Sequence, residues 1–199
     1  MFSGIIQNLG NVVNYDNGEL EITTALDLSD CMIGSSICCN GVCLTVTEIK
    51  YKDGQHKFKV NVGEETQQRT NFSHQFFNRL LSINIEKSLK IGDEIAGHFV
   101  YGHVDRTTNI TKIKKLDNSW EFFFKNFNNE DKKFIVEKGS IAINGISLTI
   151  AKEDVNNFAI SVIPHTFKNT NLRYLKAQDI VNIEFDYLAR FSMKANHDH

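Results

Sequence analysis

The chain has 199 residues and nearly balanced charge, with 22 Lys and Arg against 24 Asp and Glu and a formal net charge of −2. It contains no basic stripe or polybasic run, which argues against nucleic acid and anionic membrane as partners. No basic segment followed by a long apolar stretch opens the sequence, and nowhere do about 18 apolar residues run together. We therefore expect a soluble, cytoplasmic protein.

Short strands separated by turn signals fill the first half. The expected strands are residues 1–13, 19–24, the two arms of a hairpin between 36 and 51, 57–62 and 80–86. Asn17-Gly18 and Asp53-Gly54 supply turns between them. Residues 64–71 are polar and form either a loop or one helical turn. Six short strands with intervening turns are typical of a small barrel or sandwich.

One stretch of the chain occurs twice. Ser36-Ile-Cys-Cys-Asn-Gly-Val-Cys-Leu-Thr-Val46 returns as Ser140-Ile-Ala-Ile-Asn-Gly-Ile-Ser-Leu-Thr-Ile150. Each copy is an Asn-Gly pair flanked by alternating apolar residues, which is the strongest short-range signal for a two-residue hairpin. A type I′ turn needs positive φ at both central positions, and Asn-Gly tolerates it. Each copy therefore predicts a tight hairpin.

The register of such a turn sorts the hairpin residues by face. The inward faces are predicted to carry Cys39, Val42, Ile37 and Leu44 in the first copy, and Ile143, Ile146, Ile141 and Leu148 in the second. The outward faces then carry Cys38, Cys43, Ser36 and Thr45 in the first copy, and Ala142, Ser147, Ser140 and Thr149 in the second. These outward groups are small thiols and hydroxyls, which leave room for something else to pack there. Small β-compatible residues that simply fill the face of a hairpin would give the same pattern.

The second half repeats the order of the first. Matching residues are separated by 98 for Gly4 and Gly102, by 104 for Asn40 and Asn144, by 100 for Thr66 and Thr166, and by 98 for Asn84 and Asn182. Two tandem copies of one domain, with a short linker near residues 87–93, account for these offsets. Residues 187–195 have no counterpart and carry a helical apolar stripe. This tail docks either on its own domain or on a partner subunit.

Two histidines stand five residues apart in Gly97-His98-Phe-Val-Tyr-Gly102-His103. They fall on opposite faces of a regular strand, so a shared metal would need a bulge. No carboxylate or cysteine stands at a matching spacing, so we expect no metal site. One histidine acting as a general acid or base beside a pocket is favoured. No Gly-x-Ser-x-Gly elbow, Walker loop or Gly-x-Gly-x-x-Gly is present, so a hydrolase role for Ser147 has no supporting context.

The motifs in combination resemble the riboflavin synthase family over nearly the whole chain. They are the opening Met-Phe-Ser-Gly-Ile-Ile, the two Asn-Gly-x-[Cys/Ser]-Leu-Thr hairpins, Gly-His-Phe-x-x-Gly-His, and Ile163-Pro-His-Thr166 with Thr170-Asn171. The resemblance implies an all-β chain of two tandem, similar six-stranded β-barrels of Greek-key type plus a short C-terminal helix. The implied divisions are 1–88, 89–186 and 187–199. It also implies a homotrimer, in which the C-terminal helix helps trimerisation.

The resemblance further implies a reaction. Two molecules of 6,7-dimethyl-8-ribityllumazine exchange a four-carbon unit and give riboflavin and 5-amino-6-ribitylaminopyrimidinedione, with no cofactor. In the family each site forms between the first half of one subunit and the second half of the next. Lumazine synthase is a candidate partner. Holding two substrates in register removes much of the entropic barrier to their reaction.

Family motifs carried onto this sequence select the candidate site residues. The residues implied near the chemistry are Cys43, His103, Ser147, Thr149 and Asp186. The substrate-binding residues implied in the first half are Gly4, Ile5, Ile6, Cys43, Leu44, Thr45, Asn61, Val62, Gly63, Glu64, Glu65 and Thr66. Those implied in the second half are His103, Val104, Asp105, Lys138, Ser147, Leu148, Thr149, Val162, Ile163, Pro164, His165, Thr166 and Phe167.

Two other functions stay open at this point. A non-catalytic lumazine- or flavin-binding antenna protein would share this fold, but those relatives lose the histidine stretch, and His98 and His103 are both present here. The flavin-binding barrel of a reductase would need a nucleotide-binding domain after it, and the sequence given ends too soon to contain one.

Overall fold

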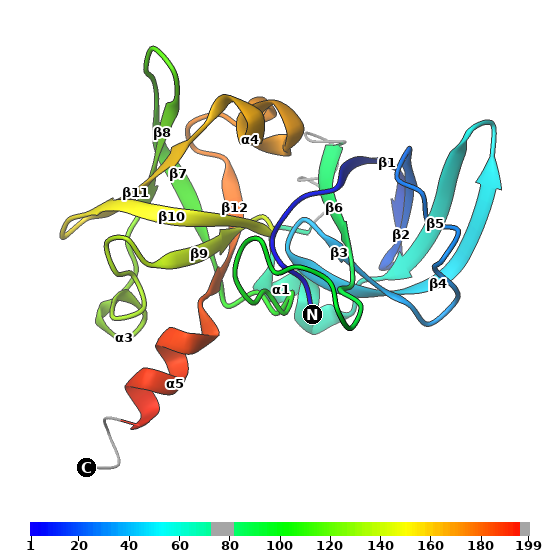
Figure 1. Ribbon diagram of the computed structural model, residues 1–199, viewed down its shortest axis with the longest axis horizontal. Coiled ribbons are helices and arrows are strands. Elements are labelled where there is room, and N and C mark those ends of the chain that lie inside the picture. Colours follow the sequence, from blue (N-terminus) through cyan, green and yellow to red (C-terminus); the bar gives the residue numbers. More distant parts are fainter. Residues whose placement is uncertain (73–81, 196–199) are drawn as a thin grey trace.

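The computed structural model describes residues 1–72 and 82–195, and it consists of two closed six-stranded antiparallel β-barrels that lie side by side (Figure 1). The strands of the first barrel are β1 (Asn8–Asp16), β2 (Glu19–Thr24), β3 (Ser36–Cys39), β4 (Val42–Lys52), β5 (Gln55–Asn61) and β6 (Ser82–Lys87). Those of the second are β7 (Arg106–Lys115), β8 (Trp120–Lys125), β9 (Ser140–Ile143), β10 (Ile146–Glu153), β11 (Asn157–Val162) and β12 (Ile180–Phe185). The predicted fold is confirmed.

Both barrels close in the same order. The first runs β1-β2-β5-β4-β3-β6, and the second has the equivalent order β7-β8-β11-β10-β9-β12. The short helices between and after the strands are α1 (Glu64–Arg69), α3 (Asn129–Lys132), α4 (Pro164–Asn169), the 3₁₀ helix η1 (Asn171–Tyr174) and α5 (Tyr187–Ala195). Helices α1 and α4 occupy corresponding places in the two halves, as the tandem repeat predicts. Residue 64 begins a helical turn, so the helical alternative for residues 64–71 is the one observed.

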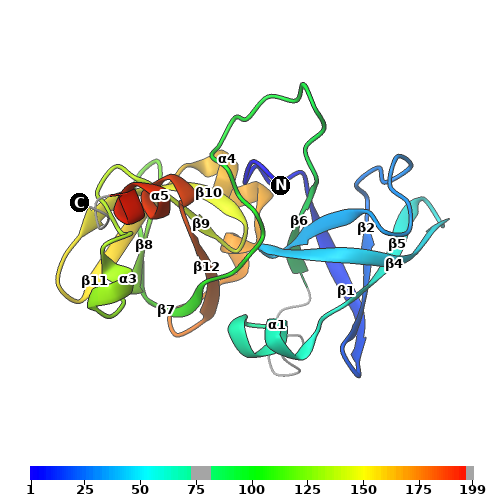
Figure 2. The same ribbon diagram turned by 90° about the horizontal axis from the view of Figure 1, so that it is seen from below.

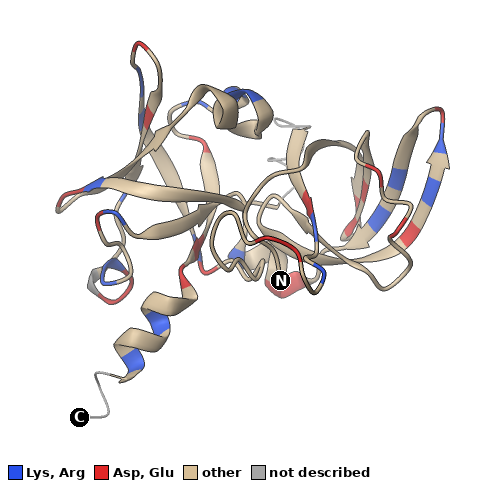
Figure 3. Cartoon of the chain, viewed as in Figure 1, with Lys and Arg blue, Asp and Glu red and all other residues tan. Residues whose placement is uncertain are grey.

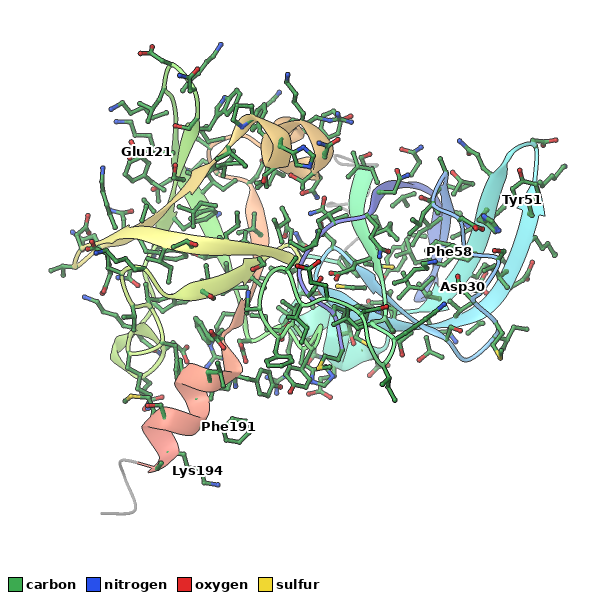
Figure 4. The ribbon with its side chains drawn as sticks, viewed as in Figure 1. Asp30, Tyr51, Phe58, Glu121, Phe191 and Lys194 are labelled. Atoms are coloured by element: carbon green, nitrogen blue, oxygen red, sulfur yellow. The ribbon has the colours of Figure 1, made fainter. Side chains whose placement is uncertain are left out.

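The Asn-Gly hairpins have the predicted geometry. Asn40 and Gly41 have φ values of 52° and 85°, and Asn144 and Gly145 have values of 49° and 80°. In the first hairpin Cys39 pairs with Val42 and Cys38 with Cys43. The second hairpin repeats this register, pairing Ile143 with Ile146 and Ala142 with Ser147. The inward residues are buried in the two barrel cores, alongside aromatic side chains such as Phe58, labelled in Figure 4.

The outward faces of the two hairpins meet each other between the barrels. Cys38 and Ala142 are buried there in one cluster with Phe2 and Val100. A Cβ atom placed on Gly41 would lie 2.6 Å from the backbone nitrogen of Gly145, so the two turns touch through their glycines. Small outward residues are therefore explained in part by close packing of one barrel on the other.

The N-terminal strand is shorter than predicted. Strand β1 begins at Asn8, because Gly4 has a φ of 76° and breaks the extended run. Residues before β1 cross to the second half, where Phe2 pairs with Val100 through hydrogen bonds of 2.7 and 3.0 Å. The linker is correspondingly longer than predicted, since residues 88–105 contain no barrel strand, and Figure 2 shows them as a loop between β6 and β7. Residues 80 and 81 of the last predicted strand lie outside the described residues, and β6 starts at Ser82.

Buried asparagine side chains join the two barrels. The Asn84 amide donates to the carbonyl of Asn144 at 2.9 Å, and the Asn182 amide donates to the carbonyl of Asn40 at 2.9 Å. The Asn171 amide donates to the Asn40 side-chain oxygen at 2.8 Å, while its backbone N–H donates to Asn84 Oδ1 at 2.8 Å. Since all five residues are buried, these bonds are shielded from water and fix how one barrel sits on the other.

Helix α5 spans residues 187–195, as predicted, and projects away from the second barrel (Figure 1). Its first turn is tied to its own chain, because Asp186 Oδ1 accepts the N–H of Leu188 at 2.9 Å and Arg190 forms an ion pair with Asp105. Leu188 in this turn and Phe191 in the next are nevertheless each 65% exposed, and Phe191 and Lys194 point outward in Figure 4.

Charged residues of both signs are interspersed over the two barrels (Figure 3). Within residues 1–72 and 82–195, no helix is long and apolar enough to cross a membrane.

Candidate substrate sites

Each half of the chain sends a short segment to the hairpin of the other half. The N–H of Cys43 in the first hairpin donates to the carbonyl of Gly102 at 2.8 Å. The N–H of Ser147 in the second hairpin donates to the carbonyl of Gly4 at 2.8 Å. The predicted segment 103–105 therefore lies at the first barrel, and the predicted segment 4–6 lies at the second. We call residues 2–6 and 100–104 the crossing segments.

The crossing segments approach the hairpins so closely that glycine is required. A Cβ atom on Gly102 would lie 2.6 Å from the Cβ of Cys43, and one on Gly4 would lie 2.6 Å from the Cβ of Ser147. Both glycines also have positive φ, at 78° and 76°, which other residues adopt only at a cost. The matching spacing of these two glycines in the sequence reflects this shared contact.

A cavity of about 340 Å³ opens at the first barrel beside Cys43. Of the predicted residues it brings together Cys43, Glu65, Thr66, His103, Val104 and Asp105. It is also lined by Val42, Arg69, Thr70, Gly102 and Tyr187, which were not predicted. Arg69 is the last residue of helix α1 and Thr70 follows it directly, so the helical turn was the signal that could have extended the list.

Several predicted first-half residues lie elsewhere. Leu44 and Val62 are buried in the core of the first barrel, so their side chains face away from the cavity. Four other predicted residues are exposed and do not line the cavity, although each is a neighbour in sequence of a lining or core residue: Thr45, Asn61, Gly63 and Glu64. The alternation of a strand explains the pattern, because Leu44 must face inward when Cys43 faces outward.

The base of helix α5 forms one wall of this cavity. The Tyr187 ring packs on Tyr101 with centroids 4.1 Å apart, and its hydroxyl lies 3.5 Å from His103 Nδ1. Arg190, one turn further along, pairs with Asp105. No local motif marks Tyr187 as a site residue, because it follows His103 by 84 positions and reaches the cavity only through the tertiary fold.

The second barrel carries a different pair of polar groups. His98 Nδ1 lies 2.7 Å from Ser147 Oγ, and His98 is partly buried. Burial lowers the pKa of His98, while the negative charge of Asp186 acts in the opposite direction. A neutral imidazole in contact with a hydroxyl can accept its proton or donate one to it, according to the tautomer. The histidine stretch thus supplies one histidine to each barrel, and His98 was absent from the predicted site list.

The other predicted second-half residues divide between the core and the surface of the second barrel. Phe167 stacks on Trp120 with ring centroids 3.9 Å apart, and Pro164 begins helix α4. The side chains of Thr149, Ile163, His165 and Lys138 are exposed, whereas Leu148 and Val162 are buried in the barrel core. Ile6 also packs against this core, and Ile5 is exposed beside it. Asp186 caps helix α5 and is not among the residues that line the cavity beside Cys43.

Comparison with known proteins identifies the two halves. A family model described as the lumazine binding domain matches residues 3–88 and again residues 101–186. A riboflavin synthase of Brucella abortus is 38% identical over 98% of this chain and 97% of its own length. The chain belongs to the riboflavin synthase family. The riboflavin synthase of Saccharomyces cerevisiae is 38% identical over 98% of this chain and 85% of its own. That of Escherichia coli is 35% identical over 94% and 87%.

Solved structures support the same fold at lower identity. Crystal structures of LumP complexed with riboflavin and with 6,7-dimethyl-8-(1'-D-ribityl) lumazine align with TM-scores of 0.75 and 0.72. Both alignments cover 93% of this chain and 99% of the LumP chain, with sequence identities of 20% and 19%. Identity is thus much higher to the riboflavin synthases than to LumP, and the chain is an enzyme of that family.

Proposed function

We propose that each barrel of this riboflavin synthase family enzyme binds one molecule of 6,7-dimethyl-8-ribityllumazine. The two bound molecules then exchange a four-carbon unit and give riboflavin and 5-amino-6-ribitylaminopyrimidinedione. One arrangement, found in both barrels, carries the proposal: a glycine carbonyl of a crossing segment accepts the backbone N–H of an outward-facing residue of an Asn-Gly hairpin. We call this arrangement the frame of each barrel. Two equivalent frames suit a reaction between two identical molecules.

The proposed frames present different chemistry to their ligands. Cys43 stands with His103 in the first barrel, and Ser147 stands with His98 in the second. One lumazine loses carbon and the other gains it, so the two molecules need different assistance. A histidine beside a thiol or hydroxyl can take and return the protons that such a transfer moves. We retain Thr149 and Asp186 as proposed residues near the chemistry of the second barrel.

The proposal includes a homotrimer in which the first barrel of one subunit faces the second barrel of the next. The exposed face of helix α5, with Leu188 and Phe191, supports a subunit contact. The corresponding functional units are residues 1–88, 89–186 and the helix-bearing tail 187–199. We also propose a cytoplasmic location, with lumazine synthase as a candidate partner.

The decisive experiment mixes the purified protein with the lumazine, without added cofactor, and follows riboflavin absorbance. Riboflavin formation is expected, with both Cys43→Ala and Ser147→Ala slowed. Thr47→Ala is the matched control, because Thr47 lies on the same strand as Cys43 but bonds the Lys59 carbonyl on the barrel exterior. Binding of lumazine without any riboflavin over hours would instead support the antenna function.

A further inference from the structure

The last strand of each barrel carries a buried glutamate. Glu86 on β6 and Glu184 on β12 are separated by 98 residues, the same offset as Gly4 and Gly102, and they are 1% and 3% exposed. Within the described part of the chain, neither carboxylate forms an ion pair with a Lys or Arg. A buried carboxylate is costly unless hydrogen bonds replace its water. These two glutamates therefore need an explanation.

Both carboxylates accept hydrogen bonds from the crossing segment of their own half. Glu184 Oε1 accepts the N–H of Tyr101 at 2.6 Å, while Oε2 accepts those of Gly102 at 2.8 Å and His103 at 3.2 Å. Glu86 Oε1 accepts the N–H and the hydroxyl of Ser3, both at 2.8 Å, and Oε2 accepts the N–H of Gly4 at 3.1 Å. Each carboxylate thus holds three donors with two oxygens.

An ionised carboxylate is the group best matched to three converging donors. It only accepts hydrogen bonds and has about four lone-pair positions, whereas a glutamine amide would turn two donors toward the same N–H groups. Bonds from backbone N–H to a charged acceptor are also stronger than neutral ones. The chemistry of the contact is therefore specific for glutamate and not only for its shape.

The donors held by Glu184 belong to the site of the other barrel. Gly102 uses its carbonyl to bind the N–H of Cys43, and His103 lines the cavity beside Cys43. In the same way Gly4, held by Glu86, uses its carbonyl to bind the N–H of Ser147. A glutamate of one barrel is therefore connected, through two successive hydrogen bonds, to the hairpin of the opposite barrel.

We propose that Glu184 and Glu86 are positioning residues, each fixing the substrate site of the opposite barrel. Glu184 sets the place of Gly102 and His103 at the first barrel, and Glu86 sets that of Gly4 at the second. The proposal rests on the proposed function, because it takes these two places as the lumazine sites. Neither glutamate touches the substrate.

The surroundings of Glu184 make its effect dependent on pH. Burial raises the pKa of Glu184 to about 7, and the charge of Asp105 adds to this shift, while the N–H groups of Tyr101, Gly102 and His103 oppose it. The titratable side chains of Cys38 and Tyr187 also interact with its charge. Protonation replaces one acceptor with an O–H donor, and the raised pKa means that the closed site is more stable with Glu184 protonated than ionised. The hold on the crossing segment therefore changes as the pH passes through about 7.

The test compares Glu184→Gln and Glu86→Gln in the full-length protein, with the lumazine as the probe. Calorimetry counts bound lumazine, and peptide-resolved mass spectrometry follows alkylation of Cys43 by iodoacetamide. We expect each variant to weaken one of two lumazine sites per chain by about tenfold or more. Alkylation of Cys43 should change in Glu184→Gln and stay at the wild-type rate in Glu86→Gln. The wild-type profile of kcat/KM against pH should also change slope near pH 7, and Glu184→Gln should lack this change.

Several results would overturn the proposal. One is wild-type affinity at both lumazine sites of Glu184→Gln. The other is the same rate of Cys43 alkylation in Glu184→Gln and Glu86→Gln. If Glu184→Gln does not fold, amide exchange at Gly102 and His103 in the wild-type protein replaces it. Protection is expected to rise as the pH drops through about 7, because the raised pKa of Glu184 favours the closed site when the carboxyl is protonated. Rapid exchange at both amides at every pH would refute the role of Glu184. Failure of the proposed function gives a different outcome, because wild-type protein would then form no riboflavin while the alkylation contrast remained.

Discussion

Replacing Gly102 by alanine tests how closely the crossing segment must approach the first hairpin. The added methyl would lie 2.6 Å from both the Cβ and the backbone N of Cys43, well inside the distance that unstrained contacts allow. It would also occupy a φ of 78°, which costs a non-glycine residue about 1–2 kcal/mol. Since the clash is with a hairpin anchored in the barrel, we expect the crossing segment to be displaced.

Gly34→Ala is the matched control for this change. Gly34 has a φ of 92°, yet nothing lies within 4 Å of the position of an added Cβ. The control therefore carries the backbone cost of about 1–2 kcal/mol without the clash. Overpacking adds about 1–3 kcal/mol more at Gly102, so its total cost should be about 2–5 kcal/mol.

Chemical denaturation measures the free energy of unfolding of both variants, and calorimetry measures their binding of the lumazine. We expect Gly34→Ala to bind two molecules per chain with wild-type affinity, and Gly102→Ala to lose the site beside Cys43. If Gly102→Ala were no less stable than Gly34→Ala and bound the lumazine equally well, the requirement for close approach would be wrong.

Three further outcomes are expected. Because the pKa of Glu184 is raised from 4.5 to about 7 in the folded protein, its stabilising contribution is complete below about pH 4.5 and is lost as the pH rises through 7. The free energy of unfolding of the wild type should fall by about 3 kcal/mol relative to Glu184→Gln over that range, and parallel pH curves would contradict this. Asn84→Ala removes the acceptor of the buried Asn171 N–H and should lower the free energy of unfolding by about 2–6 kcal/mol, with a loss below 1 kcal/mol counting against the network. Iodoacetamide should label Cys43 well before Cys38, since burial keeps the pKa of Cys38 high; equal labelling in the folded protein would exclude the buried position of Cys38.

The architecture could be predicted well because its signals are local. An Asn-Gly turn specifies type I′ geometry within four residues, and the register of Cys39 with Val42 follows from the turn alone. Because the sequence of the hairpin recurs in the second half, the same turn and register could be predicted there. The start of β1 could not be found in this way, since Phe2 is held by Val100, a residue that is distant in sequence and close only after both barrels have formed.

The sites were predictable only in part, for a related reason. Cys43 and Ser147 were found from strand alternation, and His103 from its motif and the family resemblance. Tyr187, His98 and the two glutamates were missed, because each acts through a contact between segments more than 45 residues apart. Alternation of a strand assigns a face to a residue, but it cannot tell which other segment covers that face.

The exchange of crossing segments also bears on how such a chain could arise. An arm that completes the neighbouring domain, and receives the same arm in return, is the arrangement of a domain-swapped dimer of two identical units. Here the two units are joined by residues 88–105, so a duplication that fused them would have preserved the swap. After fusion the arms were free to diverge, and the position that holds Ile5 in one arm holds His103 in the other. Two copies of one gene segment could thereby acquire unequal sites while keeping a single backbone plan.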